Sequence, residues 1–469
     1  MSFARILRSS ALMGGAQVVV LVVGFARTKL IALVLGASGV GLAGIFNSFS
    51  GSINSFAGWG LGTSGVRLIA SSTDRERAIK GAAVRQLGWT LSLVGMTLAL
   101  ALFWPVSWWT FNSNKYILEL AIVGMSVPCL IASGAWSALL QANGKIESLA
   151  KVQILGALAG MLVGLPLIYL YGTVGIAISI FLAAAWPAAL LWRSSLKHCP
   201  SGKELVADKA DIRALISLGR ALMLVGWASQ LSTYLVRMAI IRIEGLDAAG
   251  YYHAAFAISG SLPGFVFAAM GADFFPRVAA AEGEENALVA TERQIVVGLI
   301  LATPLVGVLL LFGDEIIALL FAESFFPANQ PLAWLTWGIF FRLIAWPLGY
   351  WMIARSSSRA VVAIECGAAM TLVVLQAWLT NVSGLAGAGA GFLLGYILYA
   401  VSLAIFARYK AGRWLSKSCV MFALATTMIL AAGQLALHDT PKFHAKAAFI
   451  ATLVLWSIVS YAVMKKHED

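Results

Sequence analysis

The sequence predicts an all-α integral membrane protein with about fourteen transmembrane helices, arranged as two pseudo-symmetric six-helix lobes around a central cavity plus an extra C-terminal helix pair. Three observations support this fold class. The 469 residues are 60% hydrophobic and only 12% charged, with a mean hydropathy of +0.86. Apolar runs of about twenty residues recur from end to end, and that length crosses a bilayer as a helix. The second half also repeats the hydropathic phase of the first half.

Charged residues, Gly-rich turns and Trp clusters bound the apolar runs. The predicted spans, in chain order, are 11–35, 43–68, 84–109, 116–140, 151–171, 173–192, 219–243, 249–272, 293–312, 330–353, 361–381, 386–407, 418–436 and 444–464.

In the first half, the Gly-rich turn LGASGVG at 35–41 separates spans one and two. The Trp-rich stretch FWPVSWWTF at 103–111 ends span three, as an aromatic belt at a membrane interface would. Gly172 separates spans five and six. The long polar connection 193–220 then divides the chain after span six.

The second half follows the first at an offset of 210 residues. This offset places Arg237 on Arg27 and the turn EGLDAAG at 244–250 near the first Gly-rich turn. The short turn near Gly387 falls close to the position that corresponds to Gly172. Six spans per copy is an even number, so both copies begin on the same side of the membrane, as in parallel repeats. We therefore predict lobes at 1–217 and 218–410 and an additional helix pair at 411–469.

The distribution of basic residues predicts the orientation. Of the 33 Lys and Arg, 24 fall on the side of the N-terminus, three fall on the other side and six fall within spans. Basic residues gather in cytoplasmic loops, so both termini are predicted to be cytoplasmic. The net charge of +12 thus reflects topology and does not indicate binding to nucleic acid.

Cations inside spans predict a functional cavity. An Arg near the bilayer centre costs about 2.5–3.5 kcal/mol on insertion scales, so its retention calls for a reason. Arg342 lies mid-span, Arg27 is about 12 Å from the end of its helix at 1.5 Å per residue, and Arg237 ends a polar stripe with Gln230 and Tyr234. We predict that such arginines bind an anionic group such as pyrophosphate.

Two further sets of residues complete the predicted site. Arg67, at the cytoplasmic end of span two, joins the cationic cavity. The candidate lining residues are Asn47, Asn54, Gln230, Tyr234 and Lys29. Lys29 can also reach the headgroups from its helix, and the small residues of span two also suit close helix packing. Arg242 and Glu244, at an outer helix end, are expected to form a local ion pair.

Several kinds of chemistry lack a sequence signal. The chain has no GxxxxGKS/T loop for ATP, and its five His are scattered. The four Cys, at 129, 199, 366 and 419, are widely spaced and form no CxxC pair, which predicts neither a metal site nor a disulfide. We therefore expect a protein that is not an enzyme and has no cofactor.

Residues 27–72, RTKLIALVLGASGVGLAGIFNSFSGSINSFAGWGLGTSGVRLIASS, resemble the polysaccharide transporter branch of the multidrug/oligosaccharidyl-lipid/polysaccharide exporter superfamily, and most resemble O-antigen translocases of the Wzx type. The turn LGASGVGLAG and the run GLGTSGVR are the most specific parts, and LLQANGK at 139–145 matches more weakly. By residue type and span, Arg27 and Arg67 match cavity arginines of related lipid II flippases, and Arg237 matches more loosely. Fourteen spans resemble lipid II flippases, since twelve are common among Wzx proteins.

The resemblance implies a flippase that moves an undecaprenyl-pyrophosphate-linked oligosaccharide across a bacterial inner membrane by alternating access. A glycan polymerase or a chain-length protein is a candidate partner. The alternatives are a lipid II-type flippase and a drug or cation antiporter of the same superfamily, although the first lobe lacks the intramembrane acid on which such antiporters rely. A multi-span glycosyltransferase or ligase is a third, more distant alternative.

Overall fold

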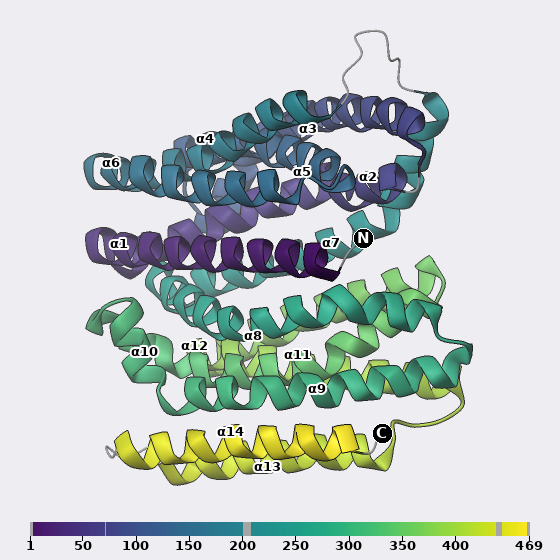
Figure 1. The fold of residues 1–469 in the computed structure, drawn as a ribbon. Helices are drawn as coiled ribbons and strands as arrows, with labels where there is room; N and C mark the ends of the chain where they lie inside the picture. The colour runs from purple at the N-terminus through teal and green to yellow at the C-terminus, as the bar shows by residue number, and fades with distance from the viewer. Residues whose placement is uncertain (1–2, 71, 200–207, 438–442, 467–469) are drawn as a thin grey trace. The chain divides into compact units, whose positions relative to one another are not determined.

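The chain is helical throughout the part that the structure describes. The computed structural model describes residues 3–70, 72–199, 208–437 and 443–466. In these ranges every regular element is a helix, which confirms the predicted all-α fold (Figure 1). The chain divides into two compact units, Met1–Gly250 and Tyr251–Asp469, and each is described by itself. The predicted lobes at 1–217 and 218–410 and the helix pair at 411–469 stay predictions.

The described residues of the first unit form seven helices and the start of an eighth. These are α1 (Phe3–Ala57), α2 (Leu61–Ala70), α3 (Asp74–Phe111), α4 (Ile117–Gly124), α5 (Ser126–Ala142), α6 (Ile146–His198), α7 (Lys209–Glu244) and α8 (Leu246–Ala280), which continues into the second unit.

Two of these helices contain a glycine that breaks the helical path. Gly36 in α1 has φ 67° and ψ −161°, and Gly172 in α6 has φ 56° and ψ −122°. Glycine adopts positive φ without the steric cost that a side chain would add. Each of these helices therefore consists of two arms, as the Gly-rich turns at 35–41 and at Gly172 predict.

The two arms of α6 form a tight antiparallel hairpin. A Cβ at Gly175 would lie 2.0 Å from the carbonyl oxygen of Leu167, although eight residues of straight helix would place the two about 12 Å apart. A Cβ at Gly164 would lie 3.0 Å from Cβ of Ser179. Small residues spaced by four thus let the two backbones approach closely, as in other membrane helix pairs.

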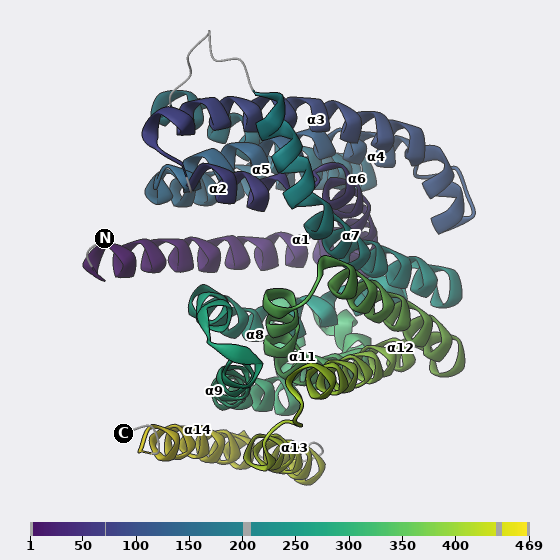
Figure 2. The same ribbon diagram turned by 90° about the vertical axis from the view of Figure 1, so that its right-hand side faces the viewer.

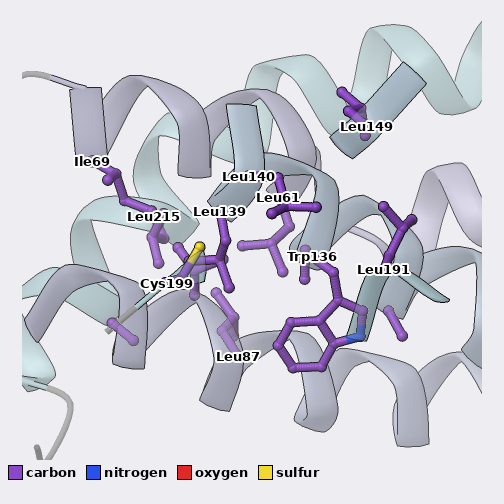
Figure 3. Packing of buried hydrophobic residues seen from close by; sticks show 14 of the residues in the cluster. Leu61, Ile69, Leu87, Trp136, Leu139, Leu140, Leu149, Leu191, Cys199 and Leu215 are labelled. Atoms are coloured by element: carbon purple, nitrogen blue, oxygen red, sulfur yellow. The ribbon is translucent and has the colours of Figure 1, made fainter. Parts of the chain in front are cut away.

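The core of the first unit lies between α2, α3, α5, α6 and α7. Figure 3 shows Trp136 and Leu139 of α5 among apolar side chains from the surrounding helices. Trp136 is 3% exposed and meets the ring of Trp89 edge-on at 5.8 Å between centroids. Figure 2 shows the helices α2, α3 and α5, which contribute residues to this cluster.

The second unit contains the remainder of α8 and the later helices. These are α9 (Gly283–Leu311), α10 (Gly313–Leu320), the 3-10 helix η1 (Glu323–Ala328), α11 (Asn329–Arg355), α12 (Ser358–Ala411), α13 (Lys417–Leu437) and α14 (Phe443–Lys466).

Helix α12 is a second hairpin, and α11 packs against it. The turn lies at Ser383 and Gly384, where Gly384 has φ 59°. A Cβ at Gly391 would lie 2.6 Å from Cα of Gln376, so the two arms run antiparallel in contact. A Cβ at Gly389 would lie 2.8 Å from Cβ of Trp334 on α11. The short turn predicted near Gly387 is therefore present three residues earlier.

The terminal pair α13 and α14 packs on α9. A Cβ at Gly307 of α9 would meet Leu453 of α14 at 2.5 Å and Leu430 of α13 at 3.7 Å. The connection that leads into α13 is fixed by Glu292 of α9, which is 6% exposed. Its carboxylate accepts hydrogen bonds from Arg413 at 2.9 Å and from the backbone N–H of Ser416 at 2.7 Å.

The helices agree with a multi-pass membrane protein. Ten described helices are long and apolar enough to cross a membrane. Three of them, α1, α6 and α12, contain two arms each, and α8 adds a further long helix. This arrangement fits the fourteen predicted spans, while the predicted cytoplasmic location of the termini stays a prediction.

Span two is less regular than the sequence predicts. The expected continuous helix over 43–68 is broken between Ala57 and Leu61. Trp59 and Gly60 have φ of 51° and 62°, and the indole N–H of Trp59 donates to the carbonyl of Ile216 at 3.0 Å. Arg67 consequently lies on the separate short helix α2.

Candidate functional site

Arg27 is held inside the first unit by a serine from α6. Its Nη2 donates to Oγ of Ser179 at 2.7 Å, and that hydroxyl, which is fully buried, donates in turn to the carbonyl of Ile176 at 2.7 Å. Arg27 is half-buried, and its Nε is buried with no hydrogen-bond partner among the described residues. The guanidinium therefore keeps N–H donors that the described protein atoms do not use.

Arg237 is more deeply buried and joins α7 to the second arm of α1. Its side chain is 7% exposed. Nη1 donates to the carbonyl oxygen of Gly44 at 2.7 Å and also to Oγ of Ser48. Hydrogen bonds from a charged donor are stronger than those between neutral groups. Inside a membrane protein, polar groups must bond to other protein groups because water is absent. Arg237 thus has a clear structural role at a helix interface.

The polar stripe on α7 faces the second arm of α1 over several turns. A Cβ at Gly51 would lie 2.8 Å from Nε2 of Gln230, and the rings of Phe56 and Trp227 are 5.1 Å apart. The small residues of α1 therefore let α7 pack closely, which is the packing role considered for them. Gln230 itself remains exposed beside this interface.

Tyr234 points to a different neighbour. Its hydroxyl shares a 2.7 Å hydrogen bond with Oγ1 of Thr110 near the end of α3, and both side chains are buried. The phenol is thus satisfied within the protein, and it connects α7 to α3 instead of adding a free polar group to a cavity.

The other predicted residues of the first unit vary in exposure. Asn47 is exposed and its amide donates to the carbonyl of Ala43 at 2.7 Å. Asn54 and Lys29 are half-buried, and Arg67 is exposed. Of the predicted set in this unit, Arg237 and Gln230 are brought to one interface with α1.

Arg342 lies in the second unit between two aromatic rings. Its Cζ is 5.4 Å from the ring centroid of Phe267 on α8 and 5.6 Å from that of Tyr396 on α12. A guanidinium at this distance is attracted by the negative face of each ring. The rings stabilise the charge without consuming its N–H donors, which leaves these donors able to bind an anion.

A half-buried carboxylate lies near Arg342. Glu365, on the first arm of α12, accepts a 2.5 Å hydrogen bond from the hydroxyl of Tyr399 on the second arm. Arg342 is close enough to Glu365 to interact with it electrostatically, yet in the described part of the chain no ion pair within 4 Å joins them.

The structure adds partners that the sequence did not single out. Ser179, Ser48 and Thr110 contact the predicted residues Arg27, Arg237 and Tyr234. Single serines and threonines are common in membrane helices, so no spacing marks these three. Tyr399, by contrast, follows Tyr396 by one helical turn, a pattern that could have pointed to an aromatic wall.

No metal cluster was expected, and among the described residues no group of three His, Cys, Asp or Glu could hold a metal ion.

Comparison with known proteins identifies relatives of the chain and structures with a similar fold. The chain is 24% identical over 402 residues to the lipid III flippases of Escherichia coli strain K12 and of Shigella flexneri, which covers 79% of this chain and 90% of each relative. The fold resembles that of lipid II flippase MurJ in its inward closed conformation, with a TM-score of 0.69 and 14% identity, over 97% of this chain and 99% of that one.

A second solved structure with the same fold is an inward-facing multidrug resistance MATE family transporter of the MOP superfamily. Its TM-score is 0.66 at 14% identity, over 87% of this chain and 95% of that one. At this level of identity, both structures support the fold alone. Residues 6–282, more than half of the chain, match the polysaccharide biosynthesis protein family, and the chain belongs to that family.

Proposed function

We propose that this protein is a flippase for a lipid-linked oligosaccharide. Its substrate would be an undecaprenyl-pyrophosphate-linked unit of O-antigen or a related surface glycan, carried from the cytoplasmic to the periplasmic leaflet of a bacterial inner membrane. The relatives named lipid III flippase support a lipid-linked substrate. The multi-pass helical fold supports alternating access between two lobes.

The observation that carries this proposal is the state of two arginines within membrane-spanning helices. Arg27 has one serine partner and a buried Nε that meets no acceptor in the described residues. Arg342 is held by two rings. A charge in a membrane helix is costly and is usually tied to function. Pyrophosphate is an acceptor that suits guanidinium N–H donors.

The predicted site residues take different roles under this proposal. Arg27 and Arg342 bind pyrophosphate, and Arg67 meets the substrate at the cytoplasmic entrance. Arg237 shapes the first unit through its bonds to α1 and contributes positive charge. Asn47, Asn54 and Gln230 contact sugar hydroxyls, and Lys29 attracts the headgroup. This mechanism uses no enzyme chemistry and no cofactor.

Two other functions remain candidates for specific reasons. A lipid II-type flippase is favoured by the likeness to MurJ across nearly the whole chain. A drug or cation antiporter is favoured by the MATE fold and by the carboxylate of Glu365 next to Tyr399. The position of Arg342 beside that carboxylate weakens the antiporter, because it opposes binding of a cation there.

The decisive experiment measures the leaflet distribution of the lipid-linked glycan in cells depleted of this protein. The wild-type chain should clear glycan from the cytoplasmic leaflet, whereas Arg342→Ala should leave it there at an unchanged protein level. Arg359→Ala is the matched control, because Arg359 is exposed at the start of α12. Normal clearance by Arg342→Ala would remove this residue from the site.

The same cells distinguish the alternatives. Accumulation of peptidoglycan precursor instead of surface glycan would identify the lipid II-type function. An unchanged glycan distribution with increased sensitivity to cationic drugs would identify the antiporter. A glycan polymerase or chain-length partner would be tested by co-purification after the substrate is known.

A further inference from the structure

A further pocket in the first unit is lined by none of the arginines assigned to the proposed transport site. It has a volume of about 410 Å³ and is lined by Thr110, Phe111, Asn112, Ser113, Lys115, Tyr116, Ile241, Arg242 and Leu246. Its walls are the end of α3, the connection to α4, the end of α7 and the start of α8. Among these nine lining residues there are two cations and no carboxylate.

The walls of this pocket are fixed by hydrogen bonds. The hydroxyl of Ser107, which is fully buried, donates to the carbonyl of Ser113 at 2.8 Å. The backbone N–H of Lys115 donates to Oγ of Ser113 at 3.1 Å. Thr110 is held by Tyr234. The connection is therefore preorganised, and a ligand would not need to order it first.

Arg242 closes one side of the pocket and retains donors for a ligand. Its Nε donates to the carbonyl of Trp109 at 2.7 Å and its Nη2 donates to that of Trp108 at 3.2 Å. The expected ion pair with Glu244 is absent from the described residues. A guanidinium has five N–H donors, so three remain for an acceptor in the pocket.

The negative end of α3 is also neutralised by these two bonds, since they occupy carbonyls of its last turn. The helices α4 and α8 begin at the same pocket, directly after Tyr116 and at Leu246. Their N-terminal N–H groups add partial positive charge. The exposed acids Glu244 and Asp247 lie nearby in sequence but outside the lining.

The second cation, Lys115, is exposed, and its ammonium lies 5.3 Å from the ring centroid of Tyr116. Three tryptophans on the last turns of α3 are also exposed: Trp104 by 56%, Trp108 by 49% and Trp109 by 58%. Exposed Trp side chains on a membrane helix are typical of the headgroup level. The pocket is therefore at the depth where lipid phosphates lie.

We propose that this pocket binds the phosphate of an anionic membrane lipid, with Lys115 and Arg242 as its cationic partners. The apolar part of the lining, Phe111, Ile241 and Leu246, suits the glycerol and first acyl carbons of such a lipid. A free phosphate ion, which is fully hydrated, would gain no binding energy from contact with these three apolar side chains. None of the lining residues belongs to the proposed transport site, and the proposal does not depend on that site.

The test uses the purified full-length protein and a photoactivatable phosphatidylglycerol, with attachment mapped by peptide mass spectrometry. We expect labelling within residues 108–116 and 241–246. Each cation near an anionic lipid contributes roughly fivefold in affinity, so Lys115→Gln should raise the half-saturating concentration about fivefold and the double variant with Arg242→Gln about 25-fold. Lys446→Gln is the matched control, because Lys446 pairs with Glu315 in the second unit.

The outcomes are separable. Because Arg242 also contacts α3, the Lys115→Gln variant alone decides the matter if the double variant does not fold. Unlabelled phosphatidylglycerol should compete and phosphatidylcholine should not. Labelling of Lys115→Gln at the wild-type concentration would overturn the proposal. Displacement by millimolar inorganic phosphate, but not by chloride at equal ionic strength, would overturn the lipid assignment in favour of a soluble anion.

Discussion

The contact between Arg237 and Ser48 can be measured with a double-mutant cycle. Ser48→Ala removes one of the two acceptors that Nη1 of Arg237 contacts and leaves the carbonyl of Gly44 in place. Neutral side-chain hydrogen bonds between membrane helices average roughly 0.6 kcal/mol and reach roughly 1.7 kcal/mol. A charged donor in a buried site strengthens the bond, so we expect a loss of about 1–2 kcal/mol in the free energy of unfolding.

The assay is reversible unfolding in mixed micelles for the wild type, Ser48→Ala, Arg237→Ala and the double variant. If the bond exists, Ser48→Ala should cost little in the Arg237→Ala background, which gives a coupling energy of about 1 kcal/mol. Ser50→Ala is the matched control. Ser50 is also buried on the same arm, and its hydroxyl donates to carbonyls of its own helix, as that of Ser48 does to Gly44. The bond from Arg237 is seen at Ser48 and distinguishes it from this control.

Two results would refute this reasoning. One is additivity of the two substitutions within about 0.5 kcal/mol, the usual error for independent sites. The other is an equal loss for Ser50→Ala, which would show that the cost comes from any buried serine of this arm. Arg237→Lys then distinguishes a structural role of Arg237 from a role in transport. If the role is mainly structural, transport and stability should fall together.

Two further predictions follow from local geometry. Gly175→Ala would place a Cβ 2.0 Å from the carbonyl oxygen of Leu167, so the free energy of unfolding in micelles should fall by about 1–3 kcal/mol or more. Gly134→Ala is the control, because no atom lies within 4 Å of its Cβ. Equal stability of the two variants would contradict the hairpin. Burial raises the pKa of the Cys199 thiol from its ordinary value, with smaller opposing effects of Arg85, Lys145 and Asn143. In a variant whose other cysteines are replaced by serine, Cys199 should therefore react slowly with maleimide near pH 7, and faster only above pH 9.0, the ordinary pKa of a cysteine thiol. Reaction near pH 7 at the rate of a free thiol would count against a buried Cys199.

The fold was largely predictable because the bilayer restricts the choice. Backbone groups without water must be bonded within a helix, so length and hydropathy suffice to find spans. The turns at Gly36 and Gly172 were also predictable, because glycine in an apolar run at the length of one span suggests a reversal. The turn predicted near Gly387 lies at Gly384. The break at Trp59 was missed although Gly58 and Gly60 flank it, because it falls inside an apolar run of one span's length and not at the end of that run.

The candidate site was less predictable for a physical reason. A cation in a span can be recognised from sequence, but its partner is set by packing between distant segments. Arg27 meets Ser179 across 152 positions, and Arg237 meets Ser48 across 189. The stripe of Gln230 and Arg237 predicted a polar surface, and the structure shows that part of this surface is used against α1. Whether the arginines bind one substrate stays a prediction.

The hairpins of α6 and α12 also bear on how the chain is made. The two arms of each hairpin are joined by a very short turn, at Gly172 in α6 and at Ser383–Gly384 in α12. The arms already pack closely against each other at glycine residues. We therefore expect the two arms of each hairpin to enter the membrane as a pair during synthesis, because no long polar loop between them has to cross the bilayer. An antibody tag or a protease site inserted at either turn is therefore expected to lower the amount of protein that reaches the membrane.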